Sequence, residues 1–454
     1  MLKNEEYVVE IIDNGFQGEG IAKIDNLAIF IPGTIKNEKV RIKILKVTSS
    51  HAYGKILEIL EKSVYRNDSD CNTYTRCGGC DLRHVDYYET LKMKENSVKN
   101  TLEKILGRSI KIEKCIGMDN PYFYRNKLQY PVGIDETGKV VIGVYAERTH
   151  QIISTRECML QDELSQKIVN DIYDFIMGKN IKVYNEKTLK GSLRHVIIRI
   201  GKKTSEVIVT LVSNEEEIKM EKELVTFLIG KYKEIKTIVK NINNKNTNVI
   251  LGDKNRILFG DGYIYDYLED YKFKISPMSF YQVNPIQTEK LYNKAIEYAE
   301  LTGMETIFDL YCGIGTIGIF ASKNVSKIYG IEVVEEAIKN AIENSKINNI
   351  ENAEFLVGNV EEILPSLIKE KNIKPDCIFL DPSRRGCEKA VLDTILEVEP
   401  KRIVYVSCNP ATLARDLKIL SEKYNIQKVQ PVDMFPYTHH VEVVVSMVLE
   451  EIIC

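Results

Sequence analysis

The sequence lacks any long apolar run. Hydrophobic residues make up 44% of the 454 residues and charged residues 28%, and no 18 apolar residues follow one another. This pattern argues against a membrane-spanning helix, and the Met-Leu-Lys-Asn-Glu-Glu start lacks the apolar stretch of a signal peptide. We therefore expect a cytoplasmic protein with no membrane partner. A length of 454 residues predicts two or three domains rather than one.

The sequence also lacks a strong net charge. A formal charge of −3 and a pI near 6.2 do not by themselves indicate a polyanion-binding protein, because such binding depends on local patches as well as on totals. One local patch is basic and contains Glu38 as its acidic residue: Lys36, Lys39, Arg41, Lys43 and Lys46. A solvated strand face is the alternative interpretation of this patch.

Residues 5–60 alternate apolar and polar positions in short runs that glycines and Pro32-Gly33 interrupt. This pattern predicts a small β-barrel of the kind that binds oligonucleotides. The stretch 15–22 reads Gly-Phe-Gln-Gly-Glu-Gly-Ile-Ala and is followed by Ile-Phe-Ile-Pro-Gly at 29–33. It resembles the TRAM domain, an RNA-binding module, although a purely structural barrel remains an alternative.

Cysteines are concentrated in one short segment. Three of the ten lie in the pattern Cys71-x5-Cys77-x2-Cys80, with no secretory context. Metal or cluster ligation is therefore favoured over disulfides. The Cys-x3-Cys-x2-Cys spacing that radical chemistry would call for is absent.

The middle of the chain predicts a mixed α+β domain. Residues 87–106 have helical spacing and are interpreted as an amphipathic packing helix. Beyond it, short β-like runs at 140–145, 196–200 and 206–212 accompany helix-like stretches at 161–177 and 215–231. A polar loop at 241–248 and a turn at 260–262 indicate a boundary near residue 265.

From residue 266 onward, strands and helices alternate regularly. Strand candidates are 306–310, 327–332, 353–357, 376–381 and 402–407. Such alternation predicts a doubly wound, Rossmann-like α/β domain with a mainly parallel sheet. The last apolar run, 441–448, has no helix after it and is expected to pair antiparallel at the sheet edge.

The first of these strands is followed by a candidate cofactor loop. Gly313-x-Gly315 allows a close backbone approach, and Glu332 follows 19 residues after Gly313, where a carboxylate can accept ribose hydroxyls. The loop has no third glycine at the offset that a dinucleotide would require. S-adenosylmethionine is therefore favoured, and Asp309 lies where its methionine end would need polar partners.

Cys408 and Glu442 are the candidate reacting residues. Cys408 follows an apolar run and precedes a helix-like segment, in Ser-Cys-Asn-Pro-Ala-Thr at 407–412. A thiolate can add to C6 of uracil and so make C5 nucleophilic, after which a base must remove the C5 proton; Glu442 is our candidate. A buried, inert cysteine and a solvated glutamate are the alternatives. His439 and His440 are interpreted as positioning a loop rather than ligating a metal.

These residues are similar to those of a known family. The motifs at 279–284, 309–316, 381–386, 407–416 and 435–442 resemble the RNA uracil-5-methyltransferases, in particular the 23S ribosomal-RNA type with a TRAM domain and an iron–sulfur cluster. The resemblance covers essentially the whole chain. It implies that Cys408 is the nucleophile and Glu442 the base, and that the cofactor-site residues are Gln282, Tyr311, Gly313, Glu332 and Asp381.

The same resemblance adds a fourth cluster ligand and shows two departures. Cys158 is expected to join Cys71, Cys77 and Cys80 around a [4Fe–4S] cluster, with a four-cysteine zinc site as the alternative. Ser383 replaces a frequent proline and Tyr437 a frequent histidine, and neither change removes a reacting group. Buried packing is expected for the remaining cysteines: Cys115, Cys312, Cys377, Cys387 and Cys454.

The combined prediction is a multidomain α/β enzyme. We expect a TRAM barrel at 1–61, a central α+β domain with the cluster at 62–265, and an S-adenosylmethionine-dependent methyltransferase domain at 266–454. It would methylate C5 of a flipped uridine in structured RNA, specifically 23S ribosomal RNA, through a cysteine–uracil adduct. Transfer-RNA methylation and a non-catalytic RNA-binding assembly factor are the alternatives. Nothing in the sequence demands more than a monomer.

Overall fold

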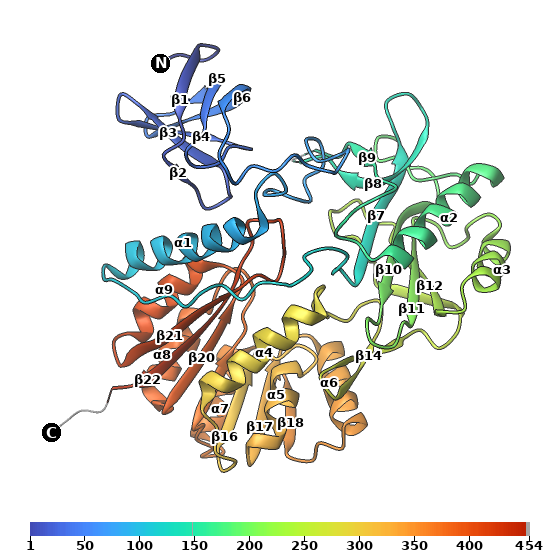
Figure 1. Ribbon diagram of the computed structural model, residues 1–454. Helices are drawn as coiled ribbons and strands as arrows, with labels where there is room; N and C mark the ends of the chain where they lie inside the picture. The colour runs from blue at the N-terminus through green and yellow to red at the C-terminus, as the bar shows by residue number, and fades with distance from the viewer. Residues whose placement is uncertain (148, 451–454) are drawn as a thin grey trace.

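A computed structural model describes residues 1–147 and 149–450. Figure 1 shows a small β-structure at the N-terminal end, a green α+β part on one side, and a yellow-to-red α/β part below both. No helix within the described residues is long and apolar enough to cross a membrane.

The N-terminal part is a six-stranded sheet around its own apolar core. Its order is β1-β5-β6-β4-β3-β2, and the strands are β1 (Glu6–Glu10), β2 (Asp13–Asn14), β3 (Gly20–Ile24), β4 (Leu27–Ile31), β5 (Lys39–Val47) and β6 (His51–Glu61). In β5, Val40, Ile42 and Ile44 are buried while the cations between them face outward. Three of the five cations of the basic patch pair with acids: Lys36 with Asp13, Lys39 with Glu61, and Arg41 with Glu6 and Glu58. The basic patch is therefore largely a paired, solvated strand face.

The central part is a seven-stranded mixed sheet with the order β13-β12-β11-β10-β7-β8-β9. Helix α2 (Glu163–Lys179) packs on it through an apolar face, and α3 (Glu221–Lys231) contacts α2. The strands are β7 (Lys127–Ile134), β8 (Val140–Tyr145), β9 (Ile152–Ser154), β10 (Leu193–Ile200), β11 (Val207–Ser213), β12 (Ile235–Ile242) and β13 (Lys254–Phe259).

The C-terminal part is a second seven-stranded sheet, with the order β18-β17-β16-β19-β20-β22-β21. Its first five strands pair in parallel: β16 (Thr306–Leu310), β17 (Lys327–Glu332), β18 (Ala353–Val357), β19 (Cys377–Leu380) and β20 (Arg402–Ser407). A hairpin, β14 (Ile264–Leu268) and β15 (Tyr271–Ile275), precedes it. The helices are α4 (Pro285–Ala299), α5 (Thr316–Ala321), α6 (Glu335–Ile347), α7 (Val360–Lys369), α8 (Lys389–Val398) and α9 (Pro410–Leu420).

The last apolar run does not form the sheet edge, which corrects the sequence-based prediction. Strand β22 (Glu442–Leu449) pairs antiparallel with β20 on one side and with β21 (Tyr424–Val432) on the other. The edge strand is β21, which was not predicted from the sequence. Strand β22 is continuously apolar because both of its faces are covered: Val443 and Val445 pack in one apolar cluster and Val444 packs in another.

Helix α1 (Tyr87–Leu106) packs on the C-terminal sheet layer, beside α9 (Figure 1). Asp86 caps its first turn, and Gly107 ends it in the left-handed conformation. Val98 and Leu102 share an apolar cluster with Leu413 and Leu417 of α9. The helix precedes the central sheet in sequence but packs on the C-terminal part. It therefore connects the N-terminal half of the chain to the C-terminal part.

Candidate active site

The loop that follows β16 forms a tight turn built on left-handed residues. Tyr311, Gly313 and Gly315 have φ angles of 65°, 55° and 80°. A Cβ on Gly315 would lie 2.8 Å from Cζ of Phe355, whereas a Cβ on Gly313 would meet nothing within 4 Å. Gly315 is therefore required for space as well as for backbone conformation.

Glu332 is fixed beside this turn at the end of β17. Its Oε2 accepts the Gly313 N–H at 3.2 Å and its Oε1 accepts the Val334 N–H at 3.0 Å. Each oxygen retains a lone pair for a further donor. The geometry is that expected of a carboxylate that accepts paired hydroxyls.

Asp309 lies under the same turn and is fully buried. Its Oδ2 accepts the Gly318 N–H at 2.9 Å, while its Oδ1 is buried without a hydrogen-bond partner among the described residues. Burial raises the pKa of this carboxyl to about 7. A buried oxygen without a partner needs a donor, which a polar ligand in the loop can provide.

Cys408 lies between the end of β20 and the start of α9. Asn409 caps α9 by accepting the Ala411 N–H at 3.1 Å. The Asn409 side chain also donates to the carbonyl oxygen of Arg384 at 3.1 Å, and the Thr412 hydroxyl donates to the same oxygen at 3.3 Å. The loop that carries Asp381 and Arg384 is thus held against the loop that carries the cysteine.

Four ionisable groups influence one another at this point: Cys408, Glu442, Asp381 and Arg384. Burial, and then the nearby Glu442, raise the pKa of the Cys408 thiol to about 11, although Arg384 opposes this. Burial and then Asp381 hold the pKa of Glu442 well above its ordinary value, again against Arg384. Burial raises the pKa of Asp381 to about 7. Cys408, Glu442 and Arg384 therefore lie close enough to one another, and to Asp381, to affect the charge of the thiol and of the Glu442 carboxyl.

Tyr292 of α4 lies near the same groups. Burial, and then Asp381, hold the pKa of its hydroxyl well above the ordinary value, while Gln282 acts in the opposite direction as a hydrogen-bond partner. The backbone oxygen of Gln282 accepts the Asn126 side-chain amide of the central part at 2.9 Å. Gln282 therefore contacts Tyr292 from a segment that is hydrogen-bonded to the central part.

Residues 433–441 form the loop between β21 and β22 that leads to Glu442, here called the 433–441 loop. Its base is held from two helices. The buried Lys94 of α1 pairs with Asp433, and on α4 the side chains of Asn284 and Gln287 donate to the backbone oxygens of Met434 and Asp433, each at 3.0 Å.

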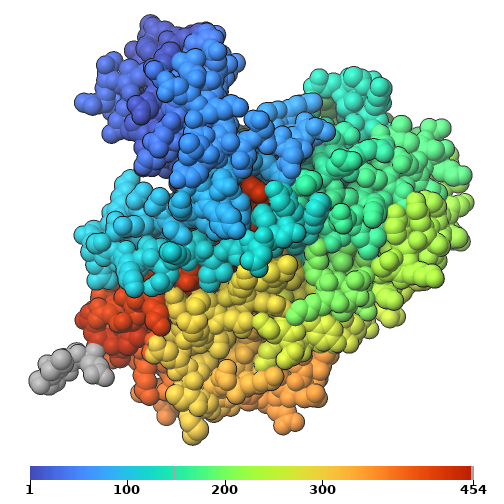
Figure 2. Space-filling model, viewed as in Figure 1, coloured from blue at the N-terminus to red at the C-terminus, as the bar shows by residue number. Residues whose placement is uncertain are grey.

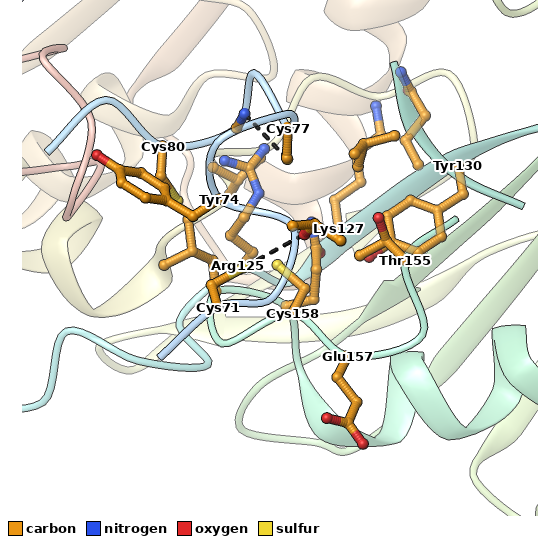
Figure 3. A pocket seen from close by; sticks show the side chains of 17 residues that line it. Cys71, Tyr74, Cys77, Cys80, Arg125, Lys127, Tyr130, Thr155, Glu157 and Cys158 are labelled. Atoms are coloured by element: carbon orange, nitrogen blue, oxygen red, sulfur yellow. Dashed lines mark hydrogen bonds between the residues drawn. The ribbon is translucent and has the colours of Figure 1, made fainter. Parts of the chain in front are cut away.

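The four predicted cluster cysteines line a separate cavity of about 350 Å³. Figure 3 shows Cys71, Cys77, Cys80 and Cys158 around it, with Arg125 and Lys127 beside them and Glu157 pointing away. Burial, and then the thiols of Cys158 and Cys77, raise the pKa of Cys80. Burial, and then Arg199 and Arg125, lower the pKa of Lys127 to about 8. The cavity thus combines four thiols with cations.

Comparison with known proteins identifies the family. The sequence profile described as tRNA (uracil-5-)-methyltransferase matches residues 86–450. The chain belongs to the RNA uracil-5-methyltransferases. The TRAM domain profile matches residues 2–57 of this methyltransferase, which confirms the TRAM domain predicted from the sequence.

Relatives cover the methyltransferase from end to end. An uncharacterized RNA methyltransferase of Clostridium acetobutylicum is 51% identical, over 98% of this chain and 97% of that one. One from Bacillus cereus is 44% identical, over 98% and 97%. The solved structure of the Pyrococcus abyssi tRNA (uracil-54, C5)-methyltransferase with S-adenosyl-L-homocysteine has a TM-score of 0.78 at 27% identity, and covers 97% of this chain and 99% of that chain.

The methyltransferase depends on S-adenosylmethionine, and the loop after β16 fits that cofactor. Glu332 presents a fixed carboxylate, and Asp309 presents the buried oxygen that needs a donor. Sequence reasoning did not find Tyr292 or Arg384. Arg384 lies within the quoted 381–386 motif and could have been weighed, whereas Tyr292 lies on an ordinary amphipathic helix with no local signal.

The arrangement of side chains in the structure does not support the predicted [4Fe–4S] ligation. Within residues 1–147 and 149–450, no group of three or more His, Cys, Asp or Glu side chains comes together so as to hold a metal ion. Nδ1 of His439 lies 2.7 Å from Oδ2 of Asp81, and its role in positioning a loop stays a prediction. Four of the remaining cysteines are buried as expected: Cys115, Cys312, Cys377 and Cys387. Cys454 lies outside the described residues.

Proposed function

We propose that this methyltransferase modifies C5 of a uridine through a covalent adduct on Cys408. The observation that carries the proposal is the proximity of Cys408 and Glu442 to each other, to Arg384 and to Asp381. The Cys408 thiolate adds to C6, C5 takes the methyl group, Glu442 removes the C5 proton, and the thiolate leaves as the C5–C6 double bond forms again. A raised pKa makes the Glu442 carboxylate a stronger base for that proton.

The remaining site residues bind and orient the reactants in this proposal. Tyr311, Gly313 and Glu332 hold the nucleoside end of S-adenosylmethionine, which supplies the methyl group. Gln282 and Asp381 also border the cofactor, and Asp381 faces the uracil as well. Both faces of C5 and C6 have to be accessible, so the base leaves its stack and enters the space between the central and C-terminal parts. The TRAM barrel then adds contacts to the RNA backbone.

A substitution at Cys408 tests the covalent mechanism. Cys408→Ala should abolish transfer of a labelled methyl group to RNA, while binding of S-adenosylmethionine, measured by calorimetry, stays within about threefold of the parent because the thiol lies outside the cofactor loop. Cys377→Ala, a buried thiol at the start of β19 and so at the end of that strand opposite Asp381, is the matched control and should stay active. Equal turnover in Cys408→Ala and the parent would rule out the adduct.

The proposed substrate is 23S ribosomal RNA, and the support for it is the resemblance that includes the cysteine segment. Transfer RNA is a second candidate, because the Pyrococcus abyssi transfer-RNA enzyme overlaps 97% of this chain. A TRAM domain therefore does not distinguish the two. Mass-spectrometric mapping of 5-methyluridine in cells with and without the gene decides: loss at ribosomal positions supports the first, loss only in transfer RNA the second, and no loss a non-catalytic role.

We further propose that the four-cysteine cavity holds a [4Fe–4S] cluster. The support is that all four thiols line one cavity of about 350 Å³, which Arg125 and Lys127 also line, while a zinc ion held by the same four cysteines is the alternative. In a four-iron cluster the thiolates bind different irons, and the cations offset their charge. Anaerobically purified protein should contain about four iron per chain. Stoichiometric zinc without iron would contradict this.

A further inference from the structure

The tip of the 433–441 loop, residues 437–440, is held by the segment that directly follows Cys80. The backbone N–H groups of Asp81 and Leu82 both donate to the carbonyl oxygen of Tyr437, each at 3.0 Å. The Asp81 carboxylate in turn accepts the backbone N–H of His439 at 3.1 Å and contacts its Nδ1 at 2.7 Å. The backbone and the side chain of Asp81 therefore both hold the tip of the loop.

Arg83 adds a second attachment. Its guanidinium lies 4.7 Å from the ring centroid of Tyr437 and 4.9 Å from that of Tyr122. Asp70 orients it by accepting from Nε at 2.9 Å and from Nη2 at 2.7 Å. The Arg83 side chain is only 3% exposed, so water screens these contacts weakly. Tyr437 is one of the two positions at which this chain departs from the family pattern.

These contacts join the cysteine cavity to the reacting groups. Cys80 lines the cavity, Asp81 and Arg83 hold the tip, and the chain then runs through His440 to Glu442. The rings of His439 and His440 are 4.1 Å apart, and that of His440 is 6.1 Å from Phe435 at the base of the loop. Figure 2 shows C-terminal atoms, in red, in a gap between the blue and cyan segments. The mechanism above uses neither Asp81 nor Arg83.

We propose that Asp81 and Arg83 are positioning residues for Glu442, so that the cysteine segment governs removal of the C5 proton rather than addition of the thiol. The inference rests on the proposed covalent mechanism. Cys408 is held independently, by α9 and by the loop that contains Arg384. Loosening the loop tip therefore displaces the base and leaves the nucleophile in place.

The proposed reaction predicts the step at which a variant with a displaced Glu442 is slowed. In the methylated adduct the C5–H bond must break, its electron pair must form the C5–C6 double bond, and the C6–S bond must break as the Cys408 thiolate leaves. Glu442 takes the proton. If Glu442 is misplaced, addition and methyl transfer still occur, but elimination is slow. The enzyme then accumulates as a covalent, methylated RNA adduct.

The experiment compares Asp81→Ala, Asp81→Asn and Arg83→Gln with the full-length parent at equal metal content per chain. Adduct is measured as labelled RNA that stays with the protein in denaturing gels, and kcat and KM are measured separately. We expect kcat to fall about tenfold or more in Asp81→Ala and Arg83→Gln, with KM changed less than about threefold. Asp81→Asn keeps an acceptor for the His439 N–H and should be intermediate.

Three controls make the result decisive. Arg76→Gln removes an exposed arginine of the same segment and should behave as the parent. Glu442→Gln should accumulate adduct and Cys408→Ala should form none. Adduct in Glu442→Gln but not in the Asp81 and Arg83 variants would overturn this inference alone. Absence of adduct from Glu442→Gln as well would overturn the covalent mechanism. A rise in KM with unchanged kcat in the Asp81 and Arg83 variants would assign these two residues to RNA binding and overturn their positioning role.

Discussion

At the scale of the residue, Cys408 lies in surroundings that disfavour its ionised form. Burial and the neighbouring carboxyl of Glu442 raise the pKa of the thiol to about 11. The thiolate is the nucleophilic form, so only a small fraction of the free enzyme is ready to react at neutral pH. Arg384 is the group that favours the thiolate.

We therefore expect adduct formation to accelerate with pH. In Glu442→Gln, where elimination is blocked, the carboxyl is gone but burial, the larger cause, still holds the thiol pKa above its ordinary value. Single-turnover rates should therefore rise about tenfold per unit between roughly pH 6 and 8, because the thiolate fraction rises by that factor below the pKa. Arg384→Gln raises the thiol pKa further and should lower the rate throughout this range. Rapid-quench measurement of the adduct checks both, and a plateau at neutral pH would contradict them.

Asp309 should make stability depend on pH with a definite sign. Burial raises its pKa from 3.8 to about 7, so the folded state favours the protonated form, and this stability is lost as pH rises from about 4 through 7. The shift corresponds to roughly 4 kcal/mol as an upper limit. Asp309→Asn, without cofactor, should therefore raise the melting temperature at pH 8 more than at pH 4. An equal effect at both would contradict the assignment.

At the scale of the element, the two glycines of the cofactor loop should differ. Gly313→Ala places an alanine in the left-handed backbone conformation without any steric contact. This lowers the free energy of unfolding by about 1 kcal/mol. Gly315→Ala meets the same conformation and also places a Cβ 2.8 Å from Phe355, so it should destabilise the protein by about 1–3 kcal/mol more and weaken cofactor binding. Chemical unfolding and calorimetry with S-adenosylmethionine measure this, and equal losses would show that Phe355 moves freely.

Local patterns predicted several elements with the bounds that the structure shows. Strands 306–310, 327–332, 353–357 and 402–407 were predicted with the observed bounds, because each is a short apolar run between two helical patterns. Strand β21 was not predicted from the sequence. Its exposed polar residues Asn425, Gln427 and Lys428, and the proline at 431, interrupt the apolar pattern of a strand. Without it, β22 could only be placed at the edge. The partners of Glu442 depend on contacts across the whole chain, which no local pattern encodes.

At the scale of the whole molecule, one buried ion pair connects the TRAM barrel to the cysteine segment. Arg66 donates to Glu38 and, at 2.7 Å, to the carbonyl oxygen of Gly33. The Glu38 side chain is fully buried and that of Arg66 is 10% exposed. Removing one partner of such a pair leaves a buried charge without compensation.

Arg66→Ala should therefore destabilise the protein by about 3–5 kcal/mol. Arg41→Ala removes an arginine whose pairs with Glu6 and Glu58 are exposed, and should cost at most about 1 kcal/mol. Thermal unfolding of both variants tests the contrast. RNA affinity should fall in Arg66→Ala, because the barrel is no longer held in place. Similar melting temperatures for the two would show that the pair contributes little.

The hydrogen bond between Asp81 and His439 joins residues 358 positions apart. During translation, the first of these residues leaves the ribosome long before the second, and contacts of such large separation form late in folding. A nascent chain that already has its N-terminal barrel and its four thiols thus cannot yet hold Glu442. Newly made protein therefore acquires catalytic competence only when its final strand has emerged.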